Sequence, residues 1–458
     1  MTLTEAVASQ IRKRIENGSL KVGTKLPSIR RAAAEFAVSK NTIVEAYDRL
    51  LAAGLIVSRP GYGFTVIDHY RRSVREPPRH VAEAVDIASL LSAQLEKSFS
   101  IRVGDGRPPP SWTEESEVSR HLSRFARDRY VVEEGYGSAM GLSALRESLA
   151  VGLAEREVEA SPSQILLTFG ANHALDLVIR RFLTAGDCVL VDDPGYYPLF
   201  AKLKLAQVRM VGVKRLAAGP DLDDLAAKAA AEPPKLFFTQ SLAHNPTGGS
   251  TNLPTAHGLL TIAAKHDFMV VEDDPFSSLP TVNGAGLAPL DQLRNVIAIG
   301  TFSKTLSASL RCGYIAGRED IVASLAELKM LTTVNSSGYV ERLLHGLLCE
   351  GHYRRHLKRL GQRISRATDT VLRTIERHGF KLFTQPTGGY YMYLDLPQEV
   401  DDIRIAREAA AEGIFIAPGS VFSVDRDTAN IGTRINIGHA GAERFYDFLK
   451  RAIERQLG

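Results

Sequence analysis

The sequence predicts a multidomain chain: a small N-terminal α+β domain is followed by a large α/β domain with a mainly parallel sheet. The chain has 458 residues, more than one ordinary core accommodates. Its first 67 residues show three helical patterns and then a β-hairpin pattern. From about residue 130 onward, apolar strand-like runs alternate with helical stretches, which is typical of α/β folds.

The composition favours a globular protein of the cytoplasm. Hydrophobic residues at 44% and charged residues at 24% are ordinary values for such domains. No apolar run approaches the roughly 20 residues that cross a bilayer, and no apolar signal segment opens the chain. Cys188, Cys312 and Cys349 are too few and too scattered for a disulfide framework or a metal cluster. We therefore expect no membrane contact and no metal site.

Basic charge is concentrated near the N-terminus. Residues 1–79 contain 14 Lys and Arg and 7 Asp and Glu, a net charge of +7, whereas the remainder contains 42 and 45, a net charge of −3. This asymmetry predicts that only the small domain meets a polyanion, although a solvated basic face is a common alternative.

Three helices are predicted in the small domain. The first covers residues 3–17, where one apolar stripe ends before Gly18; its members are Leu3, Val7, Ile11 and Ile15. Ser28 and Ser39 are suited to cap the second and third helices. Their predicted inward faces consist of Ala32, Ala33, Phe36, Ile43, Tyr47 and Leu50 or Leu51.

A hairpin completes this domain. Gly54 ends the third helix, and the runs 55–58 and 64–67 flank the turn Pro60-Gly61-Tyr62-Gly63. Three helices with a tight turn between the second and third, followed by a hairpin, form a winged helix-turn-helix, whose third helix enters the major groove of DNA.

The start of the third helix offers the candidate DNA contacts. Ser39, Lys40, Asn41 and Thr42 supply short donors and one cation, which suit phosphate oxygens and base edges. The alternative is that Ser39 is only a helix cap and Lys40 only a solvated charge.

Residues 68–98 are predicted to be a linker, because they combine paired prolines and clustered charges with little apolar periodicity. Four arginines within this segment are candidates for further DNA contacts, but a solvated tether explains them more simply; they are Arg71, Arg72, Arg75 and Arg79.

The large domain shows six strand patterns separated in several places by helices such as 173–183 and 255–266. The predicted strands are 165–169, 188–193, 236–240, 268–274, 296–302 and 312–317. In open α/β sheets the ligand binds beyond the carboxyl ends of the strands. The chemically distinctive residues of this domain follow those ends.

Lys304 is the first of them. It follows the strand 296–302 among small hydroxylated residues, where a rigid, partly desolvated amine is suited to bond an aldehyde cofactor. Thr301, Ser303 and Arg311 offer partners for a phosphate group. A Ser-Lys pair alone is a weak signal, and the phosphate-type partners strengthen it.

Asp273 ends a buried run, where a carboxylate is costly without a cation. A protonated pyridine nitrogen would be such a partner, and a loop acid bonded to backbone is the alternative. Strand alternation places Asp273 on the opposite face from Glu272 and Asp274.

Further residues fit the same ligand, each with a plainer alternative. Gly170, Ala171 and Asn172 precede a helix whose N–H groups are suited to hold phosphate. The Asn245 amide is placed to reach a ring oxygen, or to form only an Asx-turn. The remaining candidates are Tyr196, a stacking residue or a core tyrosine, and Arg434, a carboxylate clamp or an exposed arginine.

The segment SLKVGTKLPSIRRAAAEFAVSKNTIVEAYDRLLAAGLIVSRPGYGF closely resembles the GntR family of bacterial regulators. That resemblance implies that Arg30 contacts phosphate, that Lys40, Asn41 and Thr42 serve the recognition helix, and that Gly61 lies in the wing. Lys40 stands where many members have arginine, and lysine makes the two-bond contact to guanine less well.

Residues 130–458 resemble the fold-type I aminotransferases, which depend on pyridoxal 5′-phosphate (PLP). The matching segments are YGSAMGLSALR, FGANHALDLV, DDPGYYPL, HNPTGG, VVEDDPF, TFSKTLSASLRCGY and RINIGH. The resemblance implies that Lys304 forms the internal aldimine, Asp273 pairs with the pyridine nitrogen, and Asn245 contacts O3′. It further implies ring stacking by Tyr196, carboxylate binding by Arg434, and phosphate contacts by Ala171, Asn172, Thr301, Arg311 and, in the partner subunit of a dimer, Tyr136.

A GntR-like domain fused to such a domain resembles the MocR regulators throughout. The implied organisation is a winged helix-turn-helix at 1–67, a linker at 68–98 and an aminotransferase-like domain at 99–458, with its large part at about 135–330 and its small part at about 331–458. The implied function is a dimeric, operator-binding regulator that senses PLP, an amine or an amino acid. An active aminotransferase with a vestigial DNA-binding domain, and a DNA-binding protein whose large domain only dimerises, are the alternatives.

Phe276 departs from the aminotransferase pattern, in which a tyrosine donates a hydrogen bond to O3′ of the cofactor. Phenylalanine has no donor, and in a dry site the missing bond is worth roughly 1.5–3 kcal/mol. We expect a raised pKa of the bound cofactor and slow transamination. Whether the chain is an enzyme stays open from its sequence.

Overall fold

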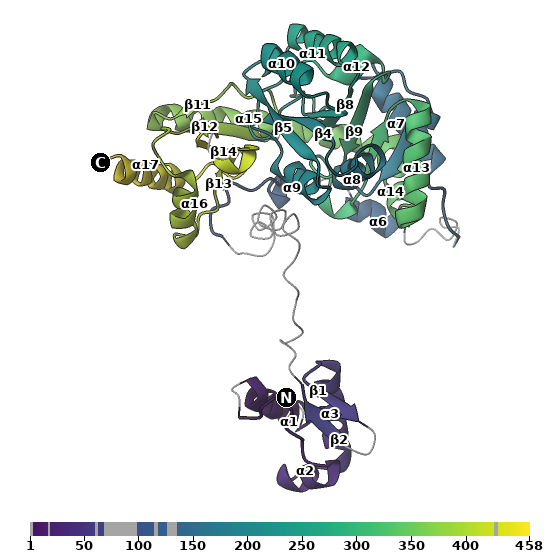
Figure 1. Cartoon of the computed structure of the whole chain (residues 1–458), viewed down its shortest axis with the longest axis vertical. Coiled ribbons are helices and arrows are strands. Elements are labelled where there is room, and N and C mark those ends of the chain that lie inside the picture. The colour runs from purple at the N-terminus through teal and green to yellow at the C-terminus, as the bar shows by residue number, and fades with distance from the viewer. Residues whose placement is uncertain are drawn as a thin grey trace. The chain divides into compact units, whose positions relative to one another are not determined.

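The computed structural model describes residues 3–16, 19–59, 63–67, 99–113, 118–125, 135–425 and 429–458. The chain divides into two compact units, Met1–Pro78 and Arg79–Gly458 (Figure 1). The predicted linker 68–98 and Gly61 lie outside the described residues. Within the described ranges, none of the helices combines the length and the apolarity that crossing a membrane requires.

The N-terminal unit has the predicted winged helix-turn-helix order. It consists of α1 (Leu3–Glu16), α2 (Ile29–Glu35), α3 (Lys40–Ala52), β1 (Ile56–Arg59) and β2 (Gly63–Val66). The strands β1 and β2 pair antiparallel.

Both predicted serine caps are confirmed. The Ser28 side chain accepts from the Arg31 N–H, and the Ser39 side chain accepts from the Thr42 N–H at 3.1 Å. The core of this unit is fully buried at Ala32, Ile43, Tyr47 and Leu50, as the helical spacing predicts, whereas Phe36 is only partly buried. The Tyr47 hydroxyl donates to the Pro27 carbonyl at 2.9 Å, so its polar end is satisfied within the core.

The second unit is built on an eight-stranded sheet in the order β3-β10-β9-β8-β7-β4-β5-β6. The strands are β3 (Ile165–Thr168), β4 (Cys188–Asp193), β5 (Arg209–Leu216), β6 (Gly219–Pro220), β7 (Leu236–Thr239), β8 (Met269–Asp274), β9 (Val296–Thr301) and β10 (Gly313–Ala316). Five consecutive strands, from β9 to β5, run parallel, and β10 runs antiparallel to both of its neighbours. The six predicted strands are confirmed within one residue at each end, while β5 and β6 escaped prediction.

Helices cover both faces of this sheet. One apolar core lies under α8 (Ala171–Phe182), α9 (Tyr197–Leu205) and α13 (Glu319–Thr333). The other lies under α7 (Ser143–Ala154), α10 (Leu222–Ala231), α11 (Leu253–Lys265), α12 (Leu287–Asp291) and α14 (Gly338–Cys349). The short helices α5 (Pro110–Thr113) and α6 (Val118–Phe125) precede them. The helix α8 begins two residues earlier than predicted, so Ala171 and Asn172 belong to its first turn.

A second, antiparallel sheet in the order β11-β12-β14-β13 forms the C-terminal part. Its elements are α15 (His352–His378), β11 (Lys381–Leu382), β12 (Tyr391–Asp395), α16 (Asp402–Ala411), β13 (Ala417–Pro418), β14 (Gly432–Asn436) and α17 (Glu443–Leu457). The segment after residue 98 packs here: Ile101 pairs with Ile414, and Val103 is fully buried in this core. This contact between the segment after residue 98 and the C-terminal part was not predicted, because its partners are about 310 residues apart in the chain.

Candidate functional site

The candidate residues gather where strands β7, β8 and β9 end and where helices α8 and α9 begin. This is the edge at which an open parallel sheet binds its ligands. Asp273 is the penultimate residue of β8, Lys304 follows β9, and Tyr196 precedes α9. The sequence prediction that these residues follow strand ends is therefore consistent with the structure.

The Lys304 side chain bonds a backbone carbonyl, and two tyrosine hydroxyls bond the backbone around it. Its Nζ donates to the Gly106 carbonyl at 2.5 Å, and the same carbonyl accepts from the Tyr391 hydroxyl at 2.8 Å. The Lys304 carbonyl accepts from the Tyr390 hydroxyl at 2.7 Å. The amine is thus fixed in position by neutral groups, and no carboxylate is among its hydrogen-bond partners in the described chain.

Asp273 is a buried carboxylate with one oxygen left without a partner. Only 8% of the residue is exposed, and Oδ2 accepts from Gln240 Nε2 at 2.7 Å. Among the described residues, Oδ1 has no hydrogen-bond partner. Burial raises the pKa of Asp273 to about 6, with Asp274 adding to the rise, against the Gln240 hydrogen bond and the charge of Lys304. A buried oxygen of this kind fits a cationic N–H group of a ligand.

Asp273→Asn should remove a pH dependence of stability from the ligand-free chain. The folded state binds the Asp273 proton more tightly than the unfolded state, so the contribution of Asp273 to stability is fully present below the ordinary pKa of 3.8 and is lost as the pH rises to about 6. Above pH 6 we expect the variant to be more stable by on the order of 2 kcal/mol. Urea unfolding from pH 4 to 8, with exposed Asp369→Asn as control, measures this. Parallel curves for all three proteins would contradict it.

A buried polar network contacts Asp273 through Gln240, and the sequence analysis did not predict it. Gln240 also accepts from the Asn245 N–H at 2.9 Å, so one side chain positions two candidate residues. The Gln240 N–H donates to Asp192 at 3.1 Å, and Asp192 pairs with Arg215 at 3.0 Å. Burial, followed by the charge of Arg215, lowers the pKa of nearby His244 to about 4, which keeps that ring neutral. An aspartate ending the apolar run CVLVDD was the one signal available for this network.

Arg434 is buried, which excludes the alternative that it is a solvent-exposed arginine. It is 2% exposed, donates to Asn245 Oδ1 at 2.9 Å and to the Gly104 carbonyl at 2.6 Å. Its guanidinium lies 4.9 Å from the Tyr391 ring centroid and 5.1 Å from that of Phe422. Its Nε has no hydrogen-bond partner within the described part of the chain. A buried guanidinium bonded to neutral acceptors suits a carboxylate ligand.

The predicted phosphate partners surround the first turn of α8. Gly170 has a φ of +86° and precedes the helix without a side-chain cap, which leaves the first N–H groups of α8 available. A Cβ on Gly170 would lie 3.4 Å from Arg311 NH2, so the guanidinium lies directly beside this turn. Arg311 donates to the Phe169 carbonyl at 2.9 Å, and the Thr301 hydroxyl donates to Ser303 Oγ at 3.1 Å. These groups fit a phosphate dianion.

Tyr136 is not brought to this site within the chain. It is 90% exposed, as a residue that acts in a partner subunit would be. Phe276 is fully buried and packs edge-on against the rings of Tyr390 and Tyr391, at centroid distances of 5.2 and 5.6 Å.

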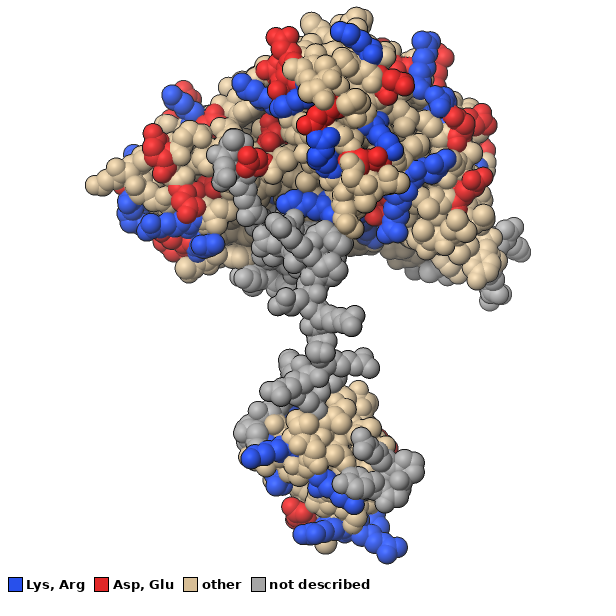
Figure 2. Space-filling model, viewed as in Figure 1, with Lys and Arg blue, Asp and Glu red and all other residues tan. Residues whose placement is uncertain are grey.

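The candidate DNA contacts lie at the start of α3. Lys40 and Asn41 are exposed, as is Arg30 on α2. Ser39 and Thr42 share a hydrogen bond between their hydroxyls at 2.8 Å, and Ser39 also caps the helix. On the visible face of this unit Lys and Arg predominate, whereas both signs intermingle on the large unit (Figure 2). The freely presented groups are therefore Arg30, Lys40 and Asn41.

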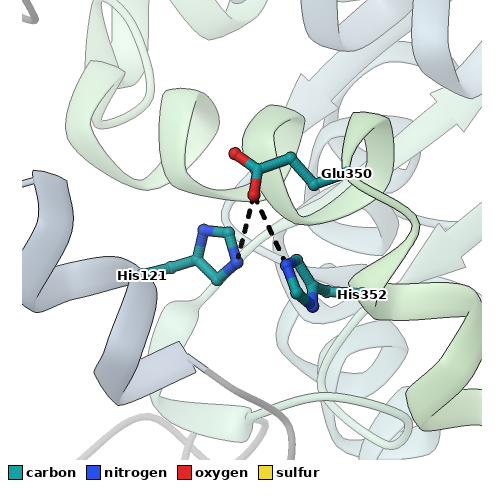
Figure 3. Close-up of side chains that lie close together, drawn as sticks. All are labelled: His121, Glu350 and His352. Carbon is teal, nitrogen blue, oxygen red and sulfur yellow. Dashed lines mark ion pairs between the residues drawn. The ribbon is translucent and has the colours of Figure 1, made fainter.

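A separate cluster joins α6 to the start of α15 (Figure 3). The Nε2 atoms of His121 and His352 point at Glu350 Oε2, at 3.9 and 3.4 Å. Arg124 donates to both oxygens of Glu350, at 3.0 and 3.1 Å, and Arg355 lies 2.7 Å from His352 Nδ1. Because the carboxylate already binds a guanidinium through both oxygens, the cluster is an ion-pair network that ties two helices together.

Two family models match different parts of the chain. Aminotransferase class I and II matches residues 108–444, and the gntR family of bacterial regulatory proteins matches residues 3–66. The first therefore covers most of the large unit and the second most of the N-terminal unit.

Two relatives that are named as regulators match most of the chain. An uncharacterized HTH-type transcriptional regulator, YisV of Bacillus subtilis, is 26% identical and covers 99% of this chain and 95% of its own. The probable rhizopine catabolism regulatory protein MocR of Rhizobium meliloti is 28% identical, and the match covers 89% of this chain and 85% of MocR.

A solved structure resembles the large unit. It is LysN, the alpha-aminoadipate aminotransferase of Thermus thermophilus, complexed with N-(5′-phosphopyridoxyl)-L-leucine. It is 26% identical, with a TM-score of 0.73, and the match covers 82% of this chain and 97% of LysN.

Proposed function

Since the chain belongs to the aminotransferase class I and II family and carries a gntR-family domain before it, we propose that it is a PLP-dependent regulator of transcription. Its N-terminal unit binds operator DNA, and its large unit binds PLP and senses that cofactor or an amine or amino acid. One observation supports the cofactor part of this proposal. Lys304 follows β9, and Asp273, whose Oδ1 has no hydrogen-bond partner among the described residues, lies near the end of the neighbouring strand β8.

The described residues fit PLP at each of its polar groups. We assign Lys304 to the aldehyde, Asp273 to the ring nitrogen and Asn245 to the phenolic oxygen. Tyr196 packs at the ring, and the phosphate is assigned to Gly170, Ala171, Asn172, Thr301, Ser303 and Arg311. When bound, PLP supplies an aldehyde that bonds amines and a ring that withdraws electrons. The chain's part is to hold the ring proton at Asp273 and to present the Lys304 amine.

Arg434 sets the class of reacting ligand. Its buried guanidinium bonds neutral acceptors only, so a ligand carboxylate gains a charge-assisted partner without displacing an ion pair. An amino acid, rather than a simple amine, is the effector that this arrangement favours. Its binding must differ between two arrangements of the protein if it is to change DNA binding.

A second candidate function is that of a working aminotransferase. The similarity to LysN favours it, and Phe276 argues against an efficient one, because the buried ring offers no donor. Steady multiple turnover with an amino donor and a keto acid, without specific DNA binding, would establish this alternative.

Phe276→Tyr is expected to lower the pKa at which the visible band of the bound cofactor titrates, by about 1 to 2 pH units. The new hydroxyl would donate a bond to the phenolic oxygen, worth roughly 1.5–3 kcal/mol in a dry site. Spectrophotometric pH titration of both proteins measures the difference. A wild type that titrates as an efficient transaminase does, and shifts little on substitution, refutes the role given to Phe276.

Lys40→Ala is expected to weaken operator binding about tenfold or more, because a groove-facing cation at the start of α3 is lost. Arg49→Ala is the matched control: it removes the same charge from the other end of α3, where the exposed Arg49 pairs with Glu5 at 3.4 Å. We expect less than a threefold change there. Fluorescence anisotropy at one fixed salt concentration compares them, since affinity for DNA depends steeply on salt. Equal losses would mean that α3 does not read the groove.

The dimer and the compartment belong to the same proposal. Regulators of this kind read two half-sites with two copies of their DNA-binding domain, so we expect a homodimer acting in the cytoplasm, where its DNA lies. The exposed Tyr136 is assigned to the phosphate site of the partner subunit.

Footprinting of the full chain on the intergenic DNA beside its own gene tests the proposed function. We expect a protected segment whose extent or affinity changes when PLP, or PLP with candidate amino acids, is added. Protection that ignores every ligand would overturn the sensor proposal and leave a plain DNA-binding protein.

A further inference from the structure

A cavity of about 480 Å³ lies on the sheet face opposite the candidate cofactor site. Its walls include Glu272 and Asp274 of β8, together with Ala298 of β9 and Tyr314 of β10. Asp273 lies between the first two in sequence and lines a different, much smaller cavity with Tyr196. Since side chains of a strand alternate between faces, the two cavities are separated by the sheet itself.

Most of the remaining wall is apolar. The helices α7, α11 and α12 and the loops that follow α7 and β7 contribute Leu153, Val158, Leu242, Leu253, Pro289 and Leu290. A volume of this size lies within the range of roughly 300–1,000 Å³ found for small-molecule sites. No residue assigned to PLP lines it, so the cavity is not an extension of that site.

Among the described residues of the cavity wall, Arg156 is the one guanidinium, and its hydrogen-bond donors are already engaged. Arg156 donates to the Gly152 carbonyl at 3.2 Å, to the Tyr314 hydroxyl at 2.8 Å and to Ser277 Oγ, and lies 3.7 Å from Asp274. Its charge is balanced by that carboxylate. An anionic ligand would have to displace these partners, so the cavity is poorly suited to one.

Acidic groups outnumber this cation. Glu272 is 3% exposed and accepts from the Leu287 and Ala288 N–H groups at 2.8 and 2.9 Å. Glu157, which is exposed, adds a third carboxylate to the lining alongside Asp274. Asp274 offsets Arg156, and burial, followed by the charge of Asp274, raises the pKa of Glu272. That leaves Glu272 and Glu157, which pair with no cation among the described residues, and a cation stabilises the charged form of an acid held between apolar walls.

We infer that this cavity binds a small amphipathic amine: a cationic nitrogen meets the carboxylates, and a compact apolar body meets the leucines. The site is separate from Lys304 and stands whether or not the proposed function holds. Its ligand would contact β8 and β9, the two strands whose ends carry Asp273 and Lys304.

Calorimetric titration of the full chain with N,N-dimethylphenethylamine tests the inference. This tertiary amine retains a cationic nitrogen and forms no imine with an aldehyde, so its binding does not report on the cofactor. The comparison ligand is 3-phenylpropanoate, an anion of similar shape. Titrations with and without PLP separate the two sites: binding of the amine without PLP, in a chain that also fails to bind PLP, would support this site while sinking the proposed function.

Two substitutions localise the binding. Ala285 lines the cavity and is partly buried, so Ala285→Phe fills it and Ala285→Leu fills less of it. Ala154→Phe places the same side chain on the exposed end of α7 outside the lining. We expect the affinity for the amine to fall at least tenfold in Ala285→Phe, less in Ala285→Leu, and not at all in Ala154→Phe. No saturable binding to the wild type, equal affinity in all four proteins, or tighter binding of the anion would each overturn the inference.

Discussion

Lys304→Ala is expected to abolish covalent retention of PLP completely. Borohydride reduction of the wild-type chain with PLP should add one cofactor mass per chain, and the visible band should disappear in the variant. The reason is that Lys304 follows β9 and its charge acts on the pKa of the buried acid Asp273 near the end of β8, so that an amine and a partner for a ring nitrogen lie at the same edge of the sheet. Among the described residues the side chain donates one hydrogen bond, to the Gly106 carbonyl, so the fold should survive its loss.

A second buried lysine makes this experiment decisive. Lys329 on α13 is fully buried, and burial lowers its pKa to about 8, which by itself would make it a candidate amine. Its Nζ donates to the carbonyls of Ala139 and Leu167, both at 2.8 Å, so it is engaged in holding the chain together. Peptide mapping should place the reduced adduct on Lys304. An adduct on Lys329, or one that persists in Lys304→Ala, would reject the assigned site.

Arg215→Leu is expected to destabilise the large unit by about 3–5 kcal/mol. It would leave Asp192 charged and uncompensated: Arg215 is 1% and Asp192 4% exposed in its side chain, and they pair at 3.0 Å. The Thr239 hydroxyl, the Gln240 N–H and the His244 ring at 3.5 Å remain as partners of Asp192. None of them carries charge near neutral pH, since the pKa of His244 is about 4 and burial is the largest cause of that shift. Because Gln240 holds Asp273, we also expect weaker binding of PLP.

Arg209→Leu is the matched control, because it alters the same strand β5. Arg209 pairs with Glu232 at the surface, with 53% of its side chain exposed, and an exposed pair is worth less than about 1 kcal/mol. Urea denaturation of the three proteins, followed by tryptophan fluorescence and circular dichroism, compares them. Equal midpoints for the two variants would show that the buried pair is not the source of stability claimed for it.

Local sequence determined most of the secondary structure. The four-residue spacing from Leu3 to Ile15, and the serines before α2 and α3, fixed the helices of the N-terminal unit because periodicity and capping act within a few residues. Apolar runs placed β4 and β9 within one residue. The strand β5 was not predicted because its run, RMVGVKRL, mixes exposed charges with apolar residues, and only the two-residue strand β6 lies beyond it in the sheet.

The candidate cofactor residues could also be predicted from the sequence, since they lie near the ends of strands or the starts of helices. What sequence left open was the state of each side chain. Arg434 reads equally well as an exposed arginine, and only the tertiary structure buries it against Asn245 and Gly104, 189 and 330 residues away.

The order of the strands and the support of Asp273 were decided by tertiary structure alone. Gln240 and Arg215 belong to none of the matching segments, yet they meet Asp192 because β4, β7 and β8 are neighbours in the sheet while β5 flanks them. A buried polar group must find a partner wherever packing provides one, and that partner is set by which strands lie side by side rather than by spacing along the chain. The sequence by itself therefore determined the elements and the chemical groups of this protein, and the fold decided which of those groups are buried, paired or left open to a ligand.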